Sequence, residues 1–173
     1  MNSRFSILSY LDISRKAVQD VINNVKSFKL KQRCKHVYEE AKRVLLFKEK
    51  CLHLSDKISA KNTVNNVVEE LGALMNASHE SLRDYYECSC NELDTLQQMC
   101  SSILGCFGCR LTGAGWGGMV VSLVQEQHAS AFIEQVKKLS FERDGQNYKG
   151  NIEEVLFVSS PCNGAIVKTL PDD

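Results

Sequence analysis

The sequence predicts an α+β fold, in which a small antiparallel sheet packs with helices and a long N-terminal helical hairpin precedes it. Three observations predict this fold. The first half of the chain has apolar residues at every third or fourth position over long stretches, as amphipathic helices do. A glycine-rich bend at 113–118 then separates two short apolar runs, as between paired strands. The order of helices first and β-β-α-β-β afterwards fits a sheet with helices on one face.

The helical part is predicted from apolar spacing. A first helix is expected at 14–25, with Ser14 as its N-cap. Two longer helices are expected at 28–52 and 62–86, where the segment 78–86 continues the second helix or lies at its end. Lys and Glu residues would form the solvated face of the 28–52 helix. Its apolar face would consist of Leu30, Cys34, Val37, Ala41, Val44 and Leu45.

The second half begins with one more helix. Asn91 is expected to start it and to cap it with its side chain, and Asp94 places a negative charge in the first turn. Gly105 is suited to end this helix. The other expected elements are strands at 109–112, 119–124, 155–158 and 165–167, a helix at 125–143 and a polar loop at 144–153.

Composition limits the classes of protein that need consideration. The 173 residues suit a single domain, 1–173, with a mainly helical part at 1–86 and an α-β-β-α-β-β part at 87–173. Lys and Arg together number 21, and so do Asp and Glu, so the formal charges balance. No general attraction to nucleic acid or to a membrane surface is therefore expected. No secretory signal or membrane span is expected, and the eight cysteines are expected to be reduced thiols in the cytoplasm.

The most informative segment is Arg-Leu-Thr-Gly-Ala-Gly-Trp-Gly-Gly-Met at 110–119. Four glycines in six residues allow positive φ angles and a close approach of another group to the backbone. Successive exposed amides in such a loop can hold an anion. The segment is neither a Walker loop nor a dinucleotide-binding loop, because it lacks the Gly-Lys-Ser/Thr ending and is followed by a strand. The alternative is a tight, closely packed β-hairpin with no ligand.

Three blocks of the chain resemble the galactokinase family of GHMP kinases. Leu-Thr-Gly-Ala-Gly-Trp-Gly-Gly at 111–118 is similar to the third signature motif of that family. The stretch 75–94, with Ser-His, Arg-Asp, Tyr-Glu and Glu-Leu-Asp in that order, and the helix at 35–44 resemble the blocks that precede it. Trp116 and the Glu-Cys-Ser-Cys at 87–90 make the chain most similar to the N-acetylgalactosamine kinases of this family.

The resemblance implies a fold like the C-terminal domain of GHMP kinases and a phosphoryl transfer. ATP, with Mg²⁺, would donate its γ-phosphate to the C1 hydroxyl of galactose or N-acetylgalactosamine. The third motif would lie near the phosphates and would act through its backbone, without a catalytic acid or base. Its residues are Gly113, Ala114, Gly115, Trp116, Gly117 and Gly118.

The same resemblance implies that the catalytic residues lie outside this chain. The family's arginine and aspartate, its sugar-binding motif and its ATP loop belong to an N-terminal domain, and the 173 residues contain no candidate for them. We therefore expect the chain on its own to be inactive. The alternative is a galactokinase-like protein that binds or regulates without catalysis.

Three further residues are candidates for a position facing the cleft, namely Ser78, His79 and Arg83. For His79 the alternative is a hydrogen-bonded structural histidine, and for Arg83 it is a local pair with Asp84 or Glu87. Trp116 could stack on a ligand or cover the hairpin. The Cys-x-x-Cys at 106–109 has zinc-like spacing but no histidine pair beside it, so no metal site is expected.

Overall fold

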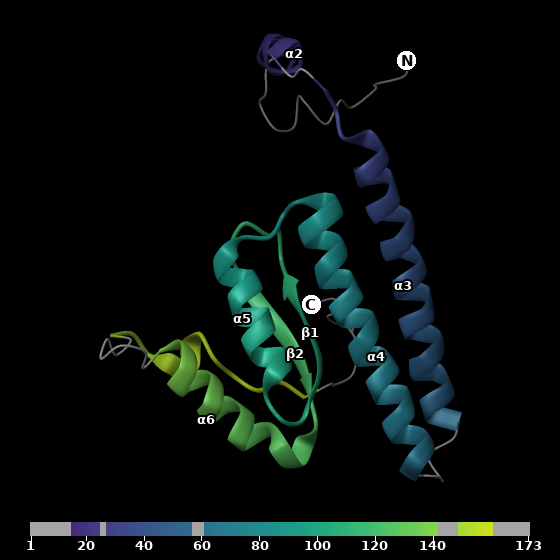
Figure 1. Ribbon diagram of the computed structural model, residues 1–173, viewed down its shortest axis with the longest axis vertical. Helices are drawn as coiled ribbons and strands as arrows, with labels where there is room; N and C mark the ends of the chain where they lie inside the picture. The colour runs from purple at the N-terminus through teal and green to yellow at the C-terminus, as the bar shows by residue number, and fades with distance from the viewer. Residues whose placement is uncertain (1–14, 25–26, 57–60, 142–148, 161–173) are drawn as a thin grey trace, which may run out of the picture.

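The computed structural model describes residues 15–24, 27–56, 61–141 and 149–160, and it confirms the predicted α+β fold (Figure 1). Helices come first, a strand hairpin follows, and one more helix completes the unit. None of the described helices combines the length and the apolarity that a membrane span requires. In chain order the elements are α2 (Arg15–Asn24), α3 (Leu30–Asp56), α4 (Lys61–Ser81), a π-helical turn η1 (Leu82–Tyr86), α5 (Asn91–Ser102), β1 (Cys106–Thr112), β2 (Met119–Val124), η2 (Glu126–His128), α6 (Ala129–Ser140) and η4 (Ile152–Glu154).

The sheet of the described residues is a two-stranded antiparallel hairpin that is covered on one face. β1 pairs with β2 in a register that places Arg110 opposite Val121 and Thr112 opposite Met119. α5 and α6 pack on the covered face, where the apolar side chains of both strands form the core. The larger core cluster contains Cys100, Ile103, Cys109, Phe132 and Val136, and the smaller one contains Leu82, Cys88, Leu93 and Leu111.

The edge of β1 that does not pair with β2 is closed by helix α4. The Cys109 amide donates to Asn76 Oδ1 at 2.9 Å, and the Leu111 amide donates to His79 Nδ1 at 3.1 Å. The helix comes this close because Gly72 faces Gly108. A Cβ atom on Gly108 would lie 2.1 Å from the Gly72 carbonyl oxygen. Side chains one helical turn apart therefore satisfy the amides that a neighbouring strand would otherwise have to pair.

Helix α3 packs with the face opposite to the expected one. Its expected apolar face is exposed, and Leu45 retains 67% of its accessible surface. The polar face meets α4 instead, because it finds partners there: buried His36 lies 2.9 Å from the Ser81 hydroxyl, measured from Nδ1. Arg33 donates to the Tyr85 carbonyl at the following turn. The helix was therefore predicted correctly, but its orientation was not.

Two smaller predictions are also wrong. Residues 155–158 do not form a strand, because the local turn uses their backbone groups: the amides of Val155 and Leu156 both donate to the Ile152 carbonyl. Leu156 still packs against the larger core cluster. The residue that caps α5 is Cys90, not Asn91, which is the first residue of the helix. The expected strand at 165–167 lies outside the described residues.

Candidate functional site: the glycine loop and the groove below it

The glycine loop, residues 113–118, forms the exposed bend between β1 and β2. Gly113, Gly115, Gly117 and Gly118 all have positive φ angles, between 87° and 144°. Side chains avoid this region of the backbone map, so the glycines are required by the shape of the bend. The loop starts no helix and lies at an open end of the hairpin, which agrees with the predicted sharp turn between paired strands.

The loop is attached to the body of the domain at one point. The Trp116 amide donates to the Cys88 carbonyl oxygen, with an N···O distance of 2.6 Å. Gly115 makes this approach feasible, because a Cβ atom there would lie 2.1 Å from the same oxygen. An anion held by this loop would consequently have to bind the remaining amides, since that of Trp116 already has an acceptor.

Trp116 itself points its indole outward. It has a left-handed backbone with φ of 52°, and 68% of its surface is accessible. A side chain that covered the hairpin would be more enclosed, so the structure favours the alternative in which the ring is available to another molecule. Trp116 is also the only tryptophan of the chain, which makes it a specific optical reporter of this loop.

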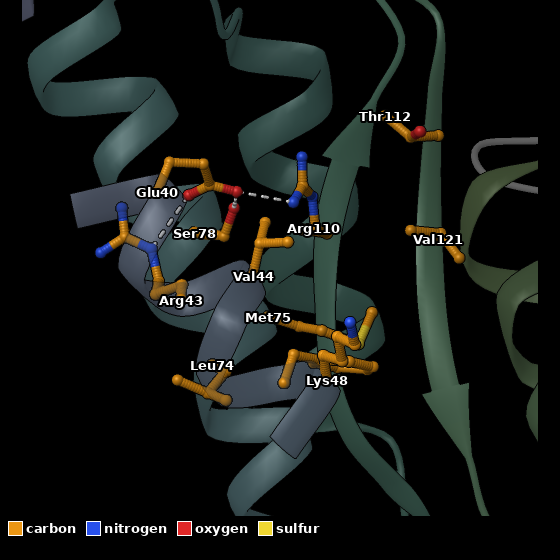
Figure 2. Close-up of a pocket in the computed structure, with 11 residues that line it drawn as sticks. Glu40, Arg43, Val44, Lys48, Leu74, Met75, Ser78, Arg110, Thr112 and Val121 are labelled. Carbon is orange, nitrogen blue, oxygen red and sulfur yellow. Dashed lines mark hydrogen bonds and ion pairs between the residues drawn. The ribbon is translucent and has the colours of Figure 1, made fainter. Parts of the chain in front are cut away.

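A groove of about 570 Å³ runs along the open face of the hairpin, below the glycine loop (Figure 2). The floor comes from both strands, and the walls come from α3 and α4. Thr112, directly before the loop, lies at one end of it. The lining residues are Glu40, Arg43, Val44, Phe47, Lys48, Leu74, Met75, Ser78, Arg110, Thr112 and Val121.

Glu40 is the centre of the polar contacts in this groove. Its carboxylate accepts hydrogen bonds from the Ser78 hydroxyl at 2.6 Å, from Arg43 Nε at 2.9 Å and from Arg110 Nη1 at 3.0 Å. Burial acts to raise the pKa of Glu40, but the Ser78 hydroxyl and the two guanidinium groups outweigh it and lower that pKa. The carboxylate is therefore ionised at neutral pH and links α3, α4 and β1.

The three candidates for a cleft-facing position occupy different environments. Ser78 lines the groove, although its hydroxyl is buried against Glu40. His79 is 1% exposed and does not reach the groove, and its ring connects β1 with α5. Arg83 forms a two-pronged pair with Asp84, at 2.7 and 3.0 Å. His79 is thus a hydrogen-bonded structural histidine, and Arg83 forms a local pair with Asp84.

Sequence reasoning missed the two residues that matter most to the groove, Glu40 and Arg110. Glu40 was assigned to a solvated helix face, because a Glu among Lys residues has no signal of burial. Arg110 directly precedes the loop motif, and this position was the available signal. Both make contacts with distant residues: Ser78 lies 38 positions from Glu40, and Arg110 lies 70 positions from Glu40.

The thiols and carboxylates of the described residues offer no ready-made metal centre. No group of three or more His, Cys, Asp or Glu side chains there could enclose an ion. Burial raises the pKa of the Cys106 thiol to about 11, so it is protonated at neutral pH and is a poor ligand.

The comparisons with known proteins agree with this geometry. Residues 59–140 match the family model for the C-terminal region of GHMP kinases. A galactokinase from Dictyostelium discoideum is 39% identical over 150 residues, which are 81% of this chain and 30% of that protein. One from Saccharomyces cerevisiae is 36% identical over 82% of this chain and 26% of its own length. The crystal structure of Lactococcus lactis galactokinase complexed with galactose superposes with a TM-score of 0.52 at 31% identity, covering 79% of this chain and 32% of that one.

The hairpin, its covering helices and the loop thus define the C-terminal fold of the GHMP kinases. Within that class, the relatives named above are galactokinases. The chain spans about a third or less of the length of these relatives.

Proposed function

We propose that this chain is the C-terminal part of an ATP-dependent sugar kinase of the galactokinase family. The kinase would phosphorylate the C1 hydroxyl of galactose or N-acetylgalactosamine. The observation that carries the proposal is the exposed bend at 113–118, where four glycines with positive φ angles present the backbone beside an open groove. The identity of 36–39% to galactokinases of two eukaryotes supports it.

In this proposal the glycine loop forms one wall of the phosphate end of the active site. Phosphoryl transfer requires mainly positioning and stabilisation of charge, and backbone amides can supply both. Mg²⁺, when bound, would neutralise charge between the phosphates. The loop's own contribution would be its backbone, which Gly115 and the bond from Trp116 to Cys88 hold in place.

The catalytic groups themselves would come from a preceding domain, and residues 1–173 would constitute a single C-terminal domain. Charged side chains of the segment 83–87 support this division, because they already have partners. Glu87 pairs with Lys29 and Arg33, and Arg83 pairs with Asp84. The isolated chain is therefore expected to be inactive. We also expect a cytoplasmic location, because the seven described cysteines are free thiols and a reducing compartment would keep them so.

We favour N-acetylgalactosamine over galactose as the sugar, on the basis of Trp116 in the loop and the Cys-Ser-Cys at 88–90. The residues that select the sugar would lie in the preceding domain. A direct comparison of both sugars as phosphate acceptors is therefore the decisive measurement for this part of the proposal.

A chimera tests the proposed function. The chain would replace the matching C-terminal region of the Dictyostelium discoideum galactokinase, and ATP-dependent phosphorylation of both sugars would be measured. The chimera should be active, and the same chimera with Gly115→Val should not, because the new side chain would collide with the Cys88 carbonyl. The chain alone should show no saturable sugar binding by calorimetry. Tight sugar binding by the chain alone, or activity that survives Gly115→Val, would contradict the proposal.

A further inference from the structure

The side chain of His79 is almost completely buried, and both of its ring nitrogens have partners. Nδ1 lies 3.1 Å from the Leu111 amide, and Nε2 lies 3.1 Å from Asp94 Oδ1. A backbone amide can only donate, so Nδ1 must be the unprotonated acceptor and Nε2–H must donate to Asp94. The fold thus selects one neutral tautomer. Burial is the main cause of the lowered pKa of His79, in agreement with a neutral ring.

Asp94 continues this hydrogen-bonded chain toward the glycine loop. Its Oδ1 also accepts from the Ser89 hydroxyl at 2.5 Å, and its amide donates to the Cys90 carbonyl at 2.9 Å. The segment 88–90 is therefore held by Asp94 from two sides. The next residue back, Cys88, carries the carbonyl that accepts the Trp116 amide. An unbroken path of hydrogen bonds and adjacent residues connects the edge of β1 with the bend at 113–118.

The loop depends on this attachment because it has little else to rest on. Gly113 and Gly117 would have nothing within 4 Å of an added Cβ atom. Trp116 holds a left-handed backbone that a non-glycine residue adopts only when its surroundings enforce it. The Trp116–Cys88 hydrogen bond is the enforcing contact. Cys88 is placed by the segment 88–90 on one side and by its own amide, which donates to the Leu82 carbonyl at 3.1 Å, on the other.

We infer that His79, Asp94 and Ser89 are positioning residues that set the place of the glycine loop through the carbonyl of Cys88. They touch no part of the loop's exposed surface and act through one hydrogen bond. The inference concerns contacts within this chain. It deepens the proposed function only in that the loop so placed would face the phosphates.

Hydrogen exchange of the Trp116 amide tests this directly on the 173-residue chain. Ser89→Ala removes one hydroxyl of the path and leaves the backbone unchanged, so the Trp116 amide should exchange about tenfold faster. Ser89→Thr restores the hydroxyl and should restore the wild-type rate. The matched control is Ser81→Ala, which removes a buried hydroxyl that bonds to His36 in α3 and not to the segment 88–90, and it should leave the Trp116 rate unchanged.

The amide of Val136 in α6, on the far side of the core, serves as the internal reference. If Ser89→Ala accelerates exchange at Val136 as much as at Trp116, the path supports the whole domain and the inference is wrong. It is also wrong if Trp116 exchanges at the same rate in Ser89→Ala, Ser81→Ala and the wild type. The anisotropy decay of Trp116, the only tryptophan, gives a second reading of loop motion in each variant. Neither measurement depends on ATP or sugar. The exchange test can therefore fail while the chimera is active, and it can succeed while the chimera is inactive.

Discussion

Helices α3 and α4 lie side by side and have comparable lengths, 27 and 21 residues, yet they bury opposite kinds of face. α4 buries Leu71, Ser78 and His79, and the His79 ring accepts an amide of β1. α3 leaves Val37, Val44 and Leu45 exposed and turns charged residues toward its neighbour. The comparison shows that apolar spacing identifies a helix but not the face that packs, because charged residues with specific partners can determine the orientation instead.

The largest effect is expected where α4 meets β1 without any intervening side chain. Gly108→Ala would place a Cβ atom 2.1 Å from the Gly72 carbonyl oxygen, so helix and strand would have to separate. The amide caps from Asn76 and His79 would then be lost together. We expect the free energy of unfolding to fall by at least about 3 kcal/mol. Urea unfolding of both forms measures this, and a loss under about 1 kcal/mol would show that the contact is not tight.

A pair of matched leucine substitutions sharpens the comparison of the two helices. Leu71→Ala in α4 should cost about 2–3 kcal/mol, because it removes a buried side chain. Leu45→Ala in α3 should change stability by about 0.5 kcal/mol or less, since that side chain is exposed. The same unfolding measurement serves both. Equal losses in the two variants would mean that the apolar face of α3 is covered in solution.

The charged contacts between α3 and α4 should contribute unequally to the free energy of unfolding along the length of the interface. Glu40→Gln leaves two arginines with a weaker acceptor inside the groove, and it should cost about 2 kcal/mol. Glu70→Gln, at the exposed pair with Lys50, is the control and should cost about 0.5 kcal/mol or less. If the control costs as much as Glu40→Gln, the groove network has no special role in orienting α3.

The smallest predicted effect is a dependence on pH. Burial lowers the pKa of His36 and of His79 in the folded protein, while histidine in an unfolded chain titrates near about 6.5. Between the lowered and the ordinary value the unfolded chain holds more protons, so stability should decrease as pH falls below about 6.5. Each histidine contributes at most about 1.4 kcal/mol per pH unit.

The groups that face these two histidines set the size of that slope. Asp94, Arg83 and Arg110 act on His79, and Glu40, Arg43 and Arg110 act on His36. His79→Gln should make the slope between pH 7 and pH 5.5 shallower, as measured by urea unfolding at several pH values. A slope that is unchanged in this variant would mean that the fold does not lower the pKa of His79.

Local patterns allowed most elements to be predicted. Apolar spacing located the helices, and the nearly continuous apolar run at 119–124 matches β2 residue for residue. The bend at 113–118 was predictable because only glycine tolerates the backbone angles that it needs. These features depend on neighbouring residues, which a sequence shows directly.

Features that depend on distant partners were not predictable. The inward turn of α3 depends on Ser78 and Arg110, and the role of His79 depends on one backbone amide and one carboxylate elsewhere in the chain. Residues 155–158 have strand-like side chains, but a turn beginning at Asn151 takes their hydrogen bonds. In each case a tertiary or turn contact overrides a local preference.

Because α4 closes the free edge of β1, further strands could pair with this sheet at only one edge. Side chains of α4 already occupy the outward amides of that strand, so nothing can be added there without displacing the helix. Any third strand, whether contributed by this chain or by another molecule, would have to join beside β2. An unwanted polymer built on this hairpin could therefore extend at one border only, and blocking β2 with a single charged or proline substitution would suffice to stop it.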